Sequence, residues 1–465
     1  MTLTYRRVPT IACLTVLLSA SAAAAQQSDR ARIIATIDSL ANAPIAEGRV
    51  AGLSVAVVRG RDTLVLKGYG SADLELEVPT PDRAVYEIGS VTKQFTAVAV
   101  LQLRDRGLLS LDDEVTEYLP DYPTQGHHVT IRRLLDHTSG IKGITEIPEF
   151  ENFVRRDLPR DSLVAVFASK PFDFAPGEAM IYNNSAYFLL GRIIAQVSGE
   201  TYEDYVARHL FAPAGMPDSR YCSERTVIPR KVKGYESRDS ALVKAGFIVH
   251  LWPYAAGSLC STAGDLLSWN RALHGNGRGG SLLNAGSYRE LITPGALNDG
   301  TPLRYAKGLA VFERGGRRLI AHSGGIFGFV SYLGYYPDDS LAVAVLINTA
   351  GAVDAGAVAN GIVDAVLGES VPPPVRPFEG SLEPLVGTYS GPGRGRPITV
   401  TVSIDSTGAL QAVLGRGNPQ RLSFLEGTTF GAGTTRVRFV RVAGRVTALQ
   451  MDQVSGVYVL PRDDD

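Results

Sequence analysis

The sequence has few of the residues that bind metals or cross-link small folds. It contains three cysteines and seven histidines in 465 residues. Cys13 lies in a segment that we expect to be removed, which leaves Cys222 and Cys260. Two cysteines are too few for a disulfide framework, and a disulfide and two free thiols are equally compatible with the sequence. No Cys/His cluster has metal-ligand spacing, and the pair His127–His128 is more typical of an exposed turn.

A strong net charge and a long apolar run are also missing. The formal net charge of −1 argues against nucleic acid or an anionic membrane as a partner. The apolar stretch 11–18 is too short to span a bilayer. It follows two arginines and precedes Ala23-Ala24-Ala25, which is the pattern of a secretory signal peptide. We therefore expect residues 1–25 to be a signal peptide and the protein to be exported, to a periplasm or outside the cell, without a membrane span.

Hydrophobic residues make up 45% of the chain, enough for more than one packed domain. Apolar runs predict a hairpin near the start and an antiparallel meander after residue 308. The predicted strands are 53–58, 63–66, 309–312, 318–322, 329–336 and 341–347, and the predicted helices are 30–47, a long one after Ser90, 187–197 and 352–366. Strands at both ends with helices between predict an α/β (α+β) domain over residues 26–370, with one antiparallel sheet flanked by helices and a mostly helical insertion.

The composition changes after residue 370. Residues 371–378 contain four prolines and predict a stiff linker. Short alternating strands with Gly-rich turns follow. We interpret residues 379–465 as a separate small all-β domain, either a barrel or a sandwich.

The first of three chemical motifs is Ser90-Val91-Thr92-Lys93. At a helix start this spacing places Ser90 and Lys93 on one helical face, where the amine can take the serine proton. The same pattern recurs at Ser139–Lys142, but there it falls in a turn, whereas Ser90 precedes a long apolar helix. The structural alternative for Ser90 is a helix N-cap.

The other two motifs are Tyr182-Asn183-Asn184 and His322-Ser323-Gly324. Tyr182 offers a second proton carrier, and Asn184 offers an amide that can hold a substrate. The glycine at a strand edge lets a substrate backbone lie close. Core packing for Tyr182 and an ordinary strand position for His322 are the structural alternatives.

With three further stretches, these motifs resemble the serine β-lactamase and penicillin-binding protein superfamily. The resemblance covers roughly residues 30–370 and favours the branch with class C β-lactamases, D-alanyl-D-alanine carboxypeptidases, D-aminopeptidases and esterases. The further stretches are 135–140, 176–191 and 256–266. The C-terminal β region resembles the lipocalin-like module that some relatives carry.

The resemblance implies a role for each motif residue. Ser90 would be the acylated nucleophile with Lys93 beside it, Tyr182 the general base and acid, and Asn184 the holder of a substrate amide. The backbone N–H groups of Ser90 and Gly325, next to Gly324, would form the oxyanion hole. By its place in a turn motif, His137 is expected to have a structural role.

One departure from the superfamily pattern concerns charge. His322 stands where β-lactamases and carboxypeptidases carry the lysine of K-T-G. A neutral imidazole weakens the case for binding a substrate carboxylate there. Arg317 and Lys307 are the candidate cations to replace this charge.

These observations predict an exported serine hydrolase that cleaves amide or ester bonds through an acyl-enzyme on Ser90. Small molecules or short peptides, some with D-residues, would be its substrates, and no metal or cofactor is needed. The alternatives are a β-lactamase, or a penicillin-binding sensor that is acylated and turns over slowly. A third possibility is that the C-terminal β domain binds a ligand or cell-wall component and hydrolysis is secondary. The oligomeric state is not predicted.

Overall fold

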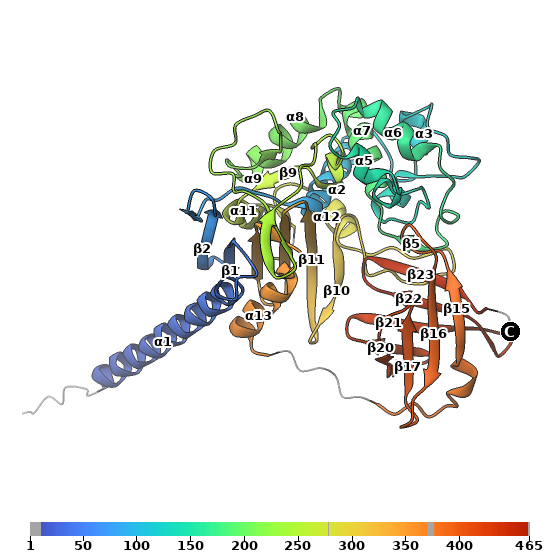
Figure 1. The fold of residues 1–465 in the computed structure, drawn as a ribbon. Coiled ribbons are helices and arrows are strands. Elements are labelled where there is room, and N and C mark those ends of the chain that lie inside the picture. Colours follow the sequence, from blue (N-terminus) through green and yellow to red (C-terminus); the bar gives the residue numbers. More distant parts are fainter. Residues whose placement is uncertain (1–10, 278, 370–375, 464–465) are drawn as a thin grey trace, which may run out of the picture.

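The computed structural model describes residues 11–277, 279–369 and 376–463. Its centre is a seven-stranded antiparallel sheet in the order β10-β11-β12-β13-β1-β2-β3 (Figure 1). The strands are β1 (Gly52–Arg59), β2 (Asp62–Asp73), β3 (Val78–Pro79), β10 (Ala310–Arg314), β11 (Arg317–Ile326), β12 (Phe329–Tyr336) and β13 (Leu341–Ile347). Leu53 of β1 lies opposite Ile347 of β13, so the sheet combines the two ends of the predicted hydrolase region, as the sequence indicates.

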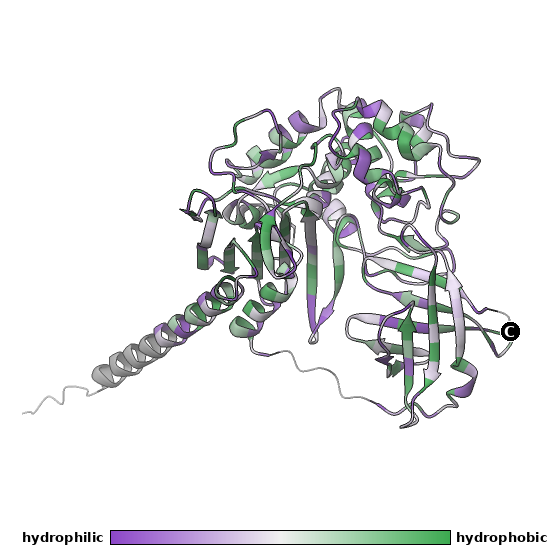
Figure 2. Ribbon diagram, viewed as in Figure 1, coloured by the Kyte–Doolittle hydropathy of each residue, from purple (hydrophilic) through white to green (hydrophobic). Residues whose placement is uncertain are grey.

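The central strands are apolar on both faces because each face has its own core. Val55 and Val57 of β1 pack with helices α1 (Ile11–Ala46) and α13 (Ala355–Leu367). Ala56 and Val58 point the other way, into the larger core beneath the helical region. A sheet covered on both faces needs near-continuous apolar strands. Figure 2 shows this as green along the central strands.

The helical region lies above the sheet in Figure 1 and is built around α2 (Thr92–Asp105). Eleven of the fourteen α2 residues are buried, which fits a helix that is apolar on nearly all sides. The other helices are α3 (Val115–Tyr118), α4 (Ile131–Leu135), α5 (Phe150–Phe153), α6 (Arg160–Ala168), α7 (Asn184–Ser198), α8 (Tyr202–Val206), α9 (Ala212–Ala214), α10 (Tyr254–Gly257), α11 (Ala263–His274) and α12 (Ala285–Leu291).

Two three-stranded sheets complete this part of the chain. They have the orders β4-β9-β6 and β14-β7-β8. Their strands are β4 (Tyr86–Glu87), β6 (Arg220–Tyr221), β7 (Tyr235–Arg238), β8 (Ala241–Lys244), β9 (Leu259–Ser261) and β14 (Thr349–Ala350). Cys260 of β9 forms a disulfide with Cys222, directly after β6, which decides between the two possibilities left open by the sequence.

The C-terminal region consists of a four-stranded and a six-stranded sheet. The strands are β15 (Gly387–Gly391), β16 (Ile398–Ile404), β17 (Leu410–Leu414), β18 (Gln420–Arg421), β19 (Ser423–Glu426), β20 (Thr429–Ala432), β21 (Thr435–Val442), β22 (Arg445–Asp452) and β23 (Gly456–Pro461). One bridge, Tyr389 to Arg462, links the two sheets, and the described strands do not close into a barrel.

A strand from the predicted α/β domain, residues 26–370, completes the six-stranded sheet. β5 (Met180–Ile181) pairs with β23 of the C-terminal region. The C-terminal core accordingly includes Ala179 and Ile181. The two regions therefore share a sheet directly before Tyr182.

The predicted secondary structure agrees with most of these bounds. Helix α1 begins earlier than the predicted start at residue 30, and β2 runs past the predicted end at residue 66. The predicted signal peptide and linker stay predictions, because residues 1–10 and 370–375 lie outside the described residues. Among the described residues, no helix is both long and apolar enough to span a bilayer.

Candidate active site

Ser90 lies in a single 3₁₀ turn, Gly89–Val91, that enters α2. Gly89 has φ +50°, which favours glycine. A Cβ at Gly89 would lie 2.9 Å from the backbone nitrogen of Gly325. The turn that carries Ser90 is therefore pressed against the end of β11.

Gly324 and Gly325 form this end of β11, and their surroundings differ. A Cβ at Gly324 would lie 2.1 Å from the carbonyl oxygen of Ile88, and the Ser331 hydroxyl donates to that same oxygen at 2.7 Å. A Cβ at Gly325 would meet nothing within 4 Å, and this residue is exposed. Gly324 thus permits close packing against the Ser90 segment, and Gly325 borders the open side.

Lys93 is fully buried below Ser90. Its Nζ lies 3.2 Å from Ser90 Oγ, 2.8 Å from Asn184 Oδ1 and 2.8 Å from the carbonyl oxygen of Ala256. Burial is the main reason that the pKa of Lys93 is well below its ordinary value, and repulsion from Arg394 adds to the effect.

The neighbours of Lys93 suit a neutral amine. The oxygens of Asn184 and Ala256 only accept hydrogen bonds, so they take the two N–H groups of a neutral –NH₂. The remaining neighbour, the Ser90 hydroxyl, can donate to the nitrogen lone pair. This arrangement places a base directly against the serine proton.

Tyr182 follows β5, and its backbone N–H donates to the carbonyl of Ser455 at 3.3 Å. Lys93 Nζ lies 4.6 Å from the centre of its ring, and the Arg394 guanidinium lies 5.3 Å from it. The Tyr182 hydroxyl is buried and has no hydrogen bond within the described chain. Burial raises the pKa of Tyr182, and the positive charge of Arg394 opposes that rise. At neutral pH this side chain is a phenol that can donate a proton.

Asn184 begins helix α7 and connects Lys93 to a second polar group. Its Oδ1 accepts from Lys93, and its Nδ2 donates to Thr145 Oγ1 at 3.1 Å. The Thr145 hydroxyl in turn donates to Glu146 Oε1 at 2.7 Å. The amide that we predicted to hold substrate therefore has a fixed orientation.

His322 is on β11, buried, and neutral. Its Nδ1 lies 2.5 Å from the carbonyl oxygen of Ser323, so Nδ1 carries the proton and Nε2 accepts from the Tyr305 hydroxyl at 2.9 Å. Burial, with repulsion from Lys93, lowers the pKa of His322 to about 3. It packs with Tyr182 and Tyr305, their ring centres 6.0 Å and 5.8 Å away. A histidine with both nitrogens engaged carries no charge to a ligand.

His137 lies beneath the same cluster. Its ring contacts those of Tyr182, Tyr187 and Tyr305, and its Nδ1 accepts from the backbone N–H of Asn183 at 3.1 Å. Burial lowers the pKa of His137 well below its ordinary value. These contacts fit the structural role expected from the turn motif.

The two candidate substitutes for the K-T-G lysine form ion pairs elsewhere. Arg317 forms an ion pair with Asp339 at 2.8 Å. Lys307 is buried and bound to Glu290 and to the carbonyl of Thr293. In the second S-x-x-K pattern, Ser139–Lys142, the lysine forms an ion pair with Asp173 at 2.6 Å.

The arrangement can be compared with known proteins. A family model described as Beta-lactamase matches residues 37–367, well over half of the chain. The chain belongs to the beta-lactamase family. It has the mixed α/β fold that the sequence predicts.

Among curated relatives, this beta-lactamase-family protein is 27% identical to Protein flp of Staphylococcus aureus over 320 residues, which are 67% of the chain but 62% of that relative. It thus spans less than two thirds of that relative's length. It is 28% identical to Penicillin-binding protein 4* of Bacillus subtilis over 316 residues, or 63% of the chain and 67% of the relative.

Two solved structures extend the comparison. The D-stereospecific amidohydrolase from Streptomyces sp. has a TM-score of 0.62 and 27% identity, and the match covers 72% of this chain and 99% of that one. The octameric penicillin-binding protein homologue from Pyrococcus abyssi has a TM-score of 0.63 and 26% identity, over 92% and 99% of the two chains.

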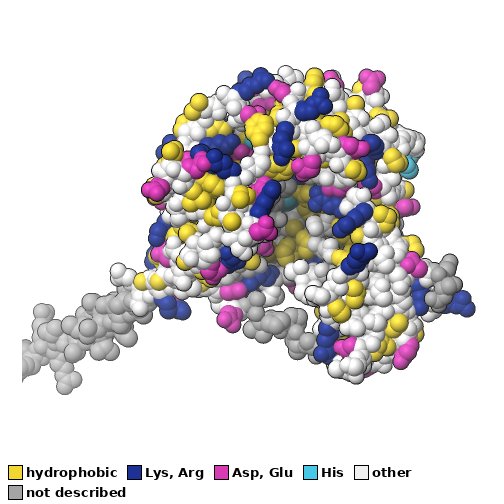
Figure 3. Space-filling view, viewed as in Figure 1, with side chains coloured by type: hydrophobic (Ala, Val, Ile, Leu, Met, Phe, Trp, Pro, Cys, Tyr) yellow, Lys and Arg dark blue, Asp and Glu magenta, His cyan; other side chains and the backbone are white. Residues whose placement is uncertain are grey.

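Sequence reasoning missed two charged residues at the site of this beta-lactamase-family protein. Arg394, in the loop between β15 and β16, donates from Nε to Glu146 Oε1 at 2.6 Å. Both residues line a pocket of about 450 Å³ together with Thr145, Gly395 and Arg396. Two arginines within the Gly- and Pro-rich stretch 392–397 were the available signal. In Figure 3, basic side chains border a hollow between the helical and C-terminal regions.

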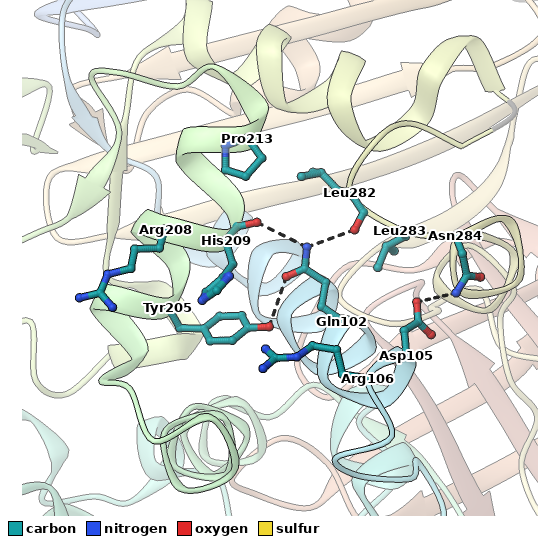
Figure 4. A pocket seen from close by; sticks show the side chains of 10 residues that line it. All are labelled: Gln102, Asp105, Arg106, Tyr205, Arg208, His209, Pro213, Leu282, Leu283 and Asn284. Carbon is teal, nitrogen blue, oxygen red and sulfur yellow. Dashed lines mark hydrogen bonds between the residues drawn. The ribbon is translucent and has the colours of Figure 1, made fainter.

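A second pocket lies at the opposite end of α2 (Figure 4). Gln102 is held there by the carbonyls of His209 and Leu282 and by the Tyr205 hydroxyl. Asp105, which also lines it, is about 18 Å along the helix from Lys93. This pocket has none of the predicted site residues.

Proposed function

We propose that this protein is an exported hydrolase that cleaves amide bonds of short peptides, and carboxylic esters, through an acyl-enzyme on Ser90. The observation that carries the proposal is the contact between Lys93 and Ser90. A buried amine whose two N–H groups are already bound directs its lone pair at the serine hydroxyl. Neutral bases of this kind activate serine nucleophiles.

In the acylation step, Ser90 Oγ forms a bond to the substrate carbonyl carbon as its proton passes to Lys93 Nζ. The developing oxyanion is held by the backbone N–H groups of Ser90 and Gly325. The phenol of Tyr182 then gives its proton to the leaving nitrogen as the C–N bond breaks. The ammonium of Lys93 returns a proton to the phenolate, so the acyl-enzyme forms with a neutral amine and a neutral phenol.

Deacylation reverses these roles with water as the nucleophile. Water adds to the ester carbon and gives a proton to the neutral amine of Lys93. The ester bond to Ser90 breaks, and Ser90 Oγ regains a proton from Lys93. Asn184 holds the amide of the acyl group during both steps.

The comparisons support amide cleavage in particular. One solved structure with a similar fold is a D-stereospecific amidohydrolase. The third motif itself holds no cation for a β-lactam carboxylate, because both nitrogens of His322 are engaged in hydrogen bonds. A penicillin-binding sensor would use the same residues but release the acyl group slowly.

The proposal is tested on the purified mature protein with a fluorophosphonate probe and a substrate panel. We expect mass spectrometry to place the adduct on Ser90, and Ser90→Ala to abolish both labelling and turnover. Ser139→Ala is the matched control and should label normally. An adduct on Ser139 would contradict the assignment.

The panel contains D- and L-aminoacyl amides, short-chain nitrophenyl esters and a chromogenic cephalosporin. Steady turnover of amides or esters is expected. A single burst followed by a stalled acyl-enzyme would instead identify a sensor, and dominant cephalosporin hydrolysis would identify a β-lactamase.

Export is part of the proposal and rests on residues 1–25. We expect N-terminal sequencing of the secreted material to begin near Gln26. Retention of residues 1–25 in that material would contradict it.

A further inference from the structure

The loop that carries Arg394 fits closely over Glu146. Gly395 has φ +75°, and a Cβ there would lie 2.8 Å from the Glu146 Cβ. On the other side, a Cβ at Gly143 would lie 1.8 Å from Glu146 Oε2. The Glu146 side chain is only 9% exposed, and an ion pair with Arg394 compensates its buried charge. Two glycines and a buried carboxylate thus fix the position of the arginine.

The Arg394 guanidinium is bound along one edge only. Nε donates to Glu146, and Nη2 approaches Thr145 Oγ1 at 3.4 Å. Nη1 makes no hydrogen bond within the described chain, and the side chain is 42% exposed. Arg396 lines the same pocket, is exposed, and forms no ion pair with any described residue. The fork of an arginine held in this way matches the two oxygens of a carboxylate.

The Arg394 guanidinium lies beside Tyr182. The guanidinium is 5.3 Å from the centre of the Tyr182 ring. Thr145, which borders the pocket, accepts a hydrogen bond from Asn184, and Asn184 contacts Lys93. One row of hydrogen-bonded side chains therefore links the lining of the pocket to Lys93.

The position next to Tyr182 indicates which part of the substrate would reach the pocket. Under the proposed function, Tyr182 gives its proton to the leaving amine. A group bound by an arginine on the same tyrosine ring therefore belongs to the leaving side. In a peptide, the leaving amine belongs to an amino acid or short peptide that ends in a carboxylate.

We propose that Arg394, with Arg396 beside it, binds the carboxylate of the leaving group and makes this enzyme selective for short peptides with a free carboxyl end. This inference rests on the proposed function and names its substrate class. Arg394 of the C-terminal region would supply the positive charge that the lysine of K-T-G supplies in β-lactamases and carboxypeptidases. His322, Arg317 and Lys307 do not supply it, because the first is neutral and the others are paired elsewhere.

The test compares two substrates that differ only in this charge. N-acetyl-D-Ala-D-Ala and its C-terminal carboxamide are hydrolysed by the full-length enzyme, as are the matching L,L peptides, and the ratio of the two kcat/KM values is measured. We expect the wild type to prefer the carboxylate about tenfold or more, because charged hydrogen bonds are roughly twice as strong as neutral ones. Arg394→Gln should remove most of that preference, and Arg394→Glu should reverse it.

Further variants separate binding from folding. Arg394→Lys keeps the charge but not the fork, so its ratio should lie between those of the wild type and Arg394→Gln. Arg416→Ala removes an exposed arginine of the same region that lines neither pocket and should leave the ratio and the activity unchanged. Arg396→Ala should lower the preference less than Arg394→Gln does.

The outcomes distinguish this inference from the proposed function. A wild-type ratio near one, a ratio that Arg394→Gln leaves unchanged, or ester turnover without cleavage of any carboxylate peptide would overturn the role of Arg394. In each of these cases, Ser90-dependent turnover of a nitrophenyl ester would still support the hydrolase. Loss of Ser90 labelling and of all turnover would instead overturn the proposed function itself.

Discussion

Replacing Gly324 with alanine tests how tightly β11 packs against the Ser90 segment. The new methyl group would lie 2.1 Å from the Ile88 carbonyl oxygen and 2.3 Å from Ser331 Oγ, so both must move. Overpacking of this kind costs about 1–3 kcal/mol. Loss of the Ser331–Ile88 hydrogen bond adds about 1 kcal/mol. We therefore expect Gly324→Ala to lower the free energy of unfolding by about 2–4 kcal/mol.

The neighbouring glycine provides the control, since a Cβ at Gly325 meets nothing within 4 Å. Gly325→Ala should keep the wild-type Tm, whereas Gly324→Ala should unfold several degrees earlier. A displacement of about 1 Å at a reacting group can cost roughly 10²-fold in rate, so fluorophosphonate labelling of folded Gly324→Ala should also be slow. Equal Tm values and equal labelling rates for the two variants would refute the packing described for β11.

Three further predictions concern proton transfer, acid sensitivity and the disulfide. Lys93→Ala and Tyr182→Phe should each reduce kcat for a nitrophenyl ester by about 10²- to 10⁴-fold. Lys93→Ala should also abolish the acidic limb of the pH–rate profile, because that limb reports the lowered pKa of Lys93. An unchanged limb would assign it to another group. Burial lowers the pKa of His274 to about 3, so its contribution to stability is complete above pH 6.5 and is lost as the pH falls from 6.5 toward 3. Tm should therefore fall over this pH range, and it should fall less steeply in His274→Gln. Identical slopes of Tm against pH in the two proteins would exclude His274 as the cause. The Cys222–Cys260 disulfide closes 38 residues, so the double serine variant should lose roughly 4 kcal/mol in guanidinium unfolding, and a reductant should destabilise the wild type but not that variant.

The sequence predicts the features that depend on local pattern. β1 and β13 were recognisable as strands because both of their faces are buried, so both faces are apolar. Ser90 and Lys93 were recognisable because three residues separate them at a helix start, and the remaining motif residues follow in a fixed order. Their roles stay proposals, while the sheet and the family are confirmed.

Local sequence patterns do not predict contacts between segments that are far apart in the chain. Arg394 and Glu146 are 248 residues apart, and an ion pair over that distance leaves no periodicity in the sequence. β5 has only two residues, too few for a recognisable strand, although it joins the C-terminal sheet. The neutrality of His322 likewise depends on its burial against Tyr305, which its neighbours in the sequence do not encode.

The pairing of β1 with β13 also constrains how the protein is made. The ribosome adds about 5–20 residues per second, and Leu53 must wait for Ile347, about 300 residues later. For roughly 15–60 s, the β1–β2 hairpin is therefore outside the ribosome with its β13-facing edge unpaired. The nascent chain consequently passes through a long interval in which one edge of the apolar strand β1 is available for wrong pairing or for binding by a chaperone. Folding of the sheet is thus completed only late in synthesis, and slow release from the ribosome would lengthen the interval in which misfolding competes.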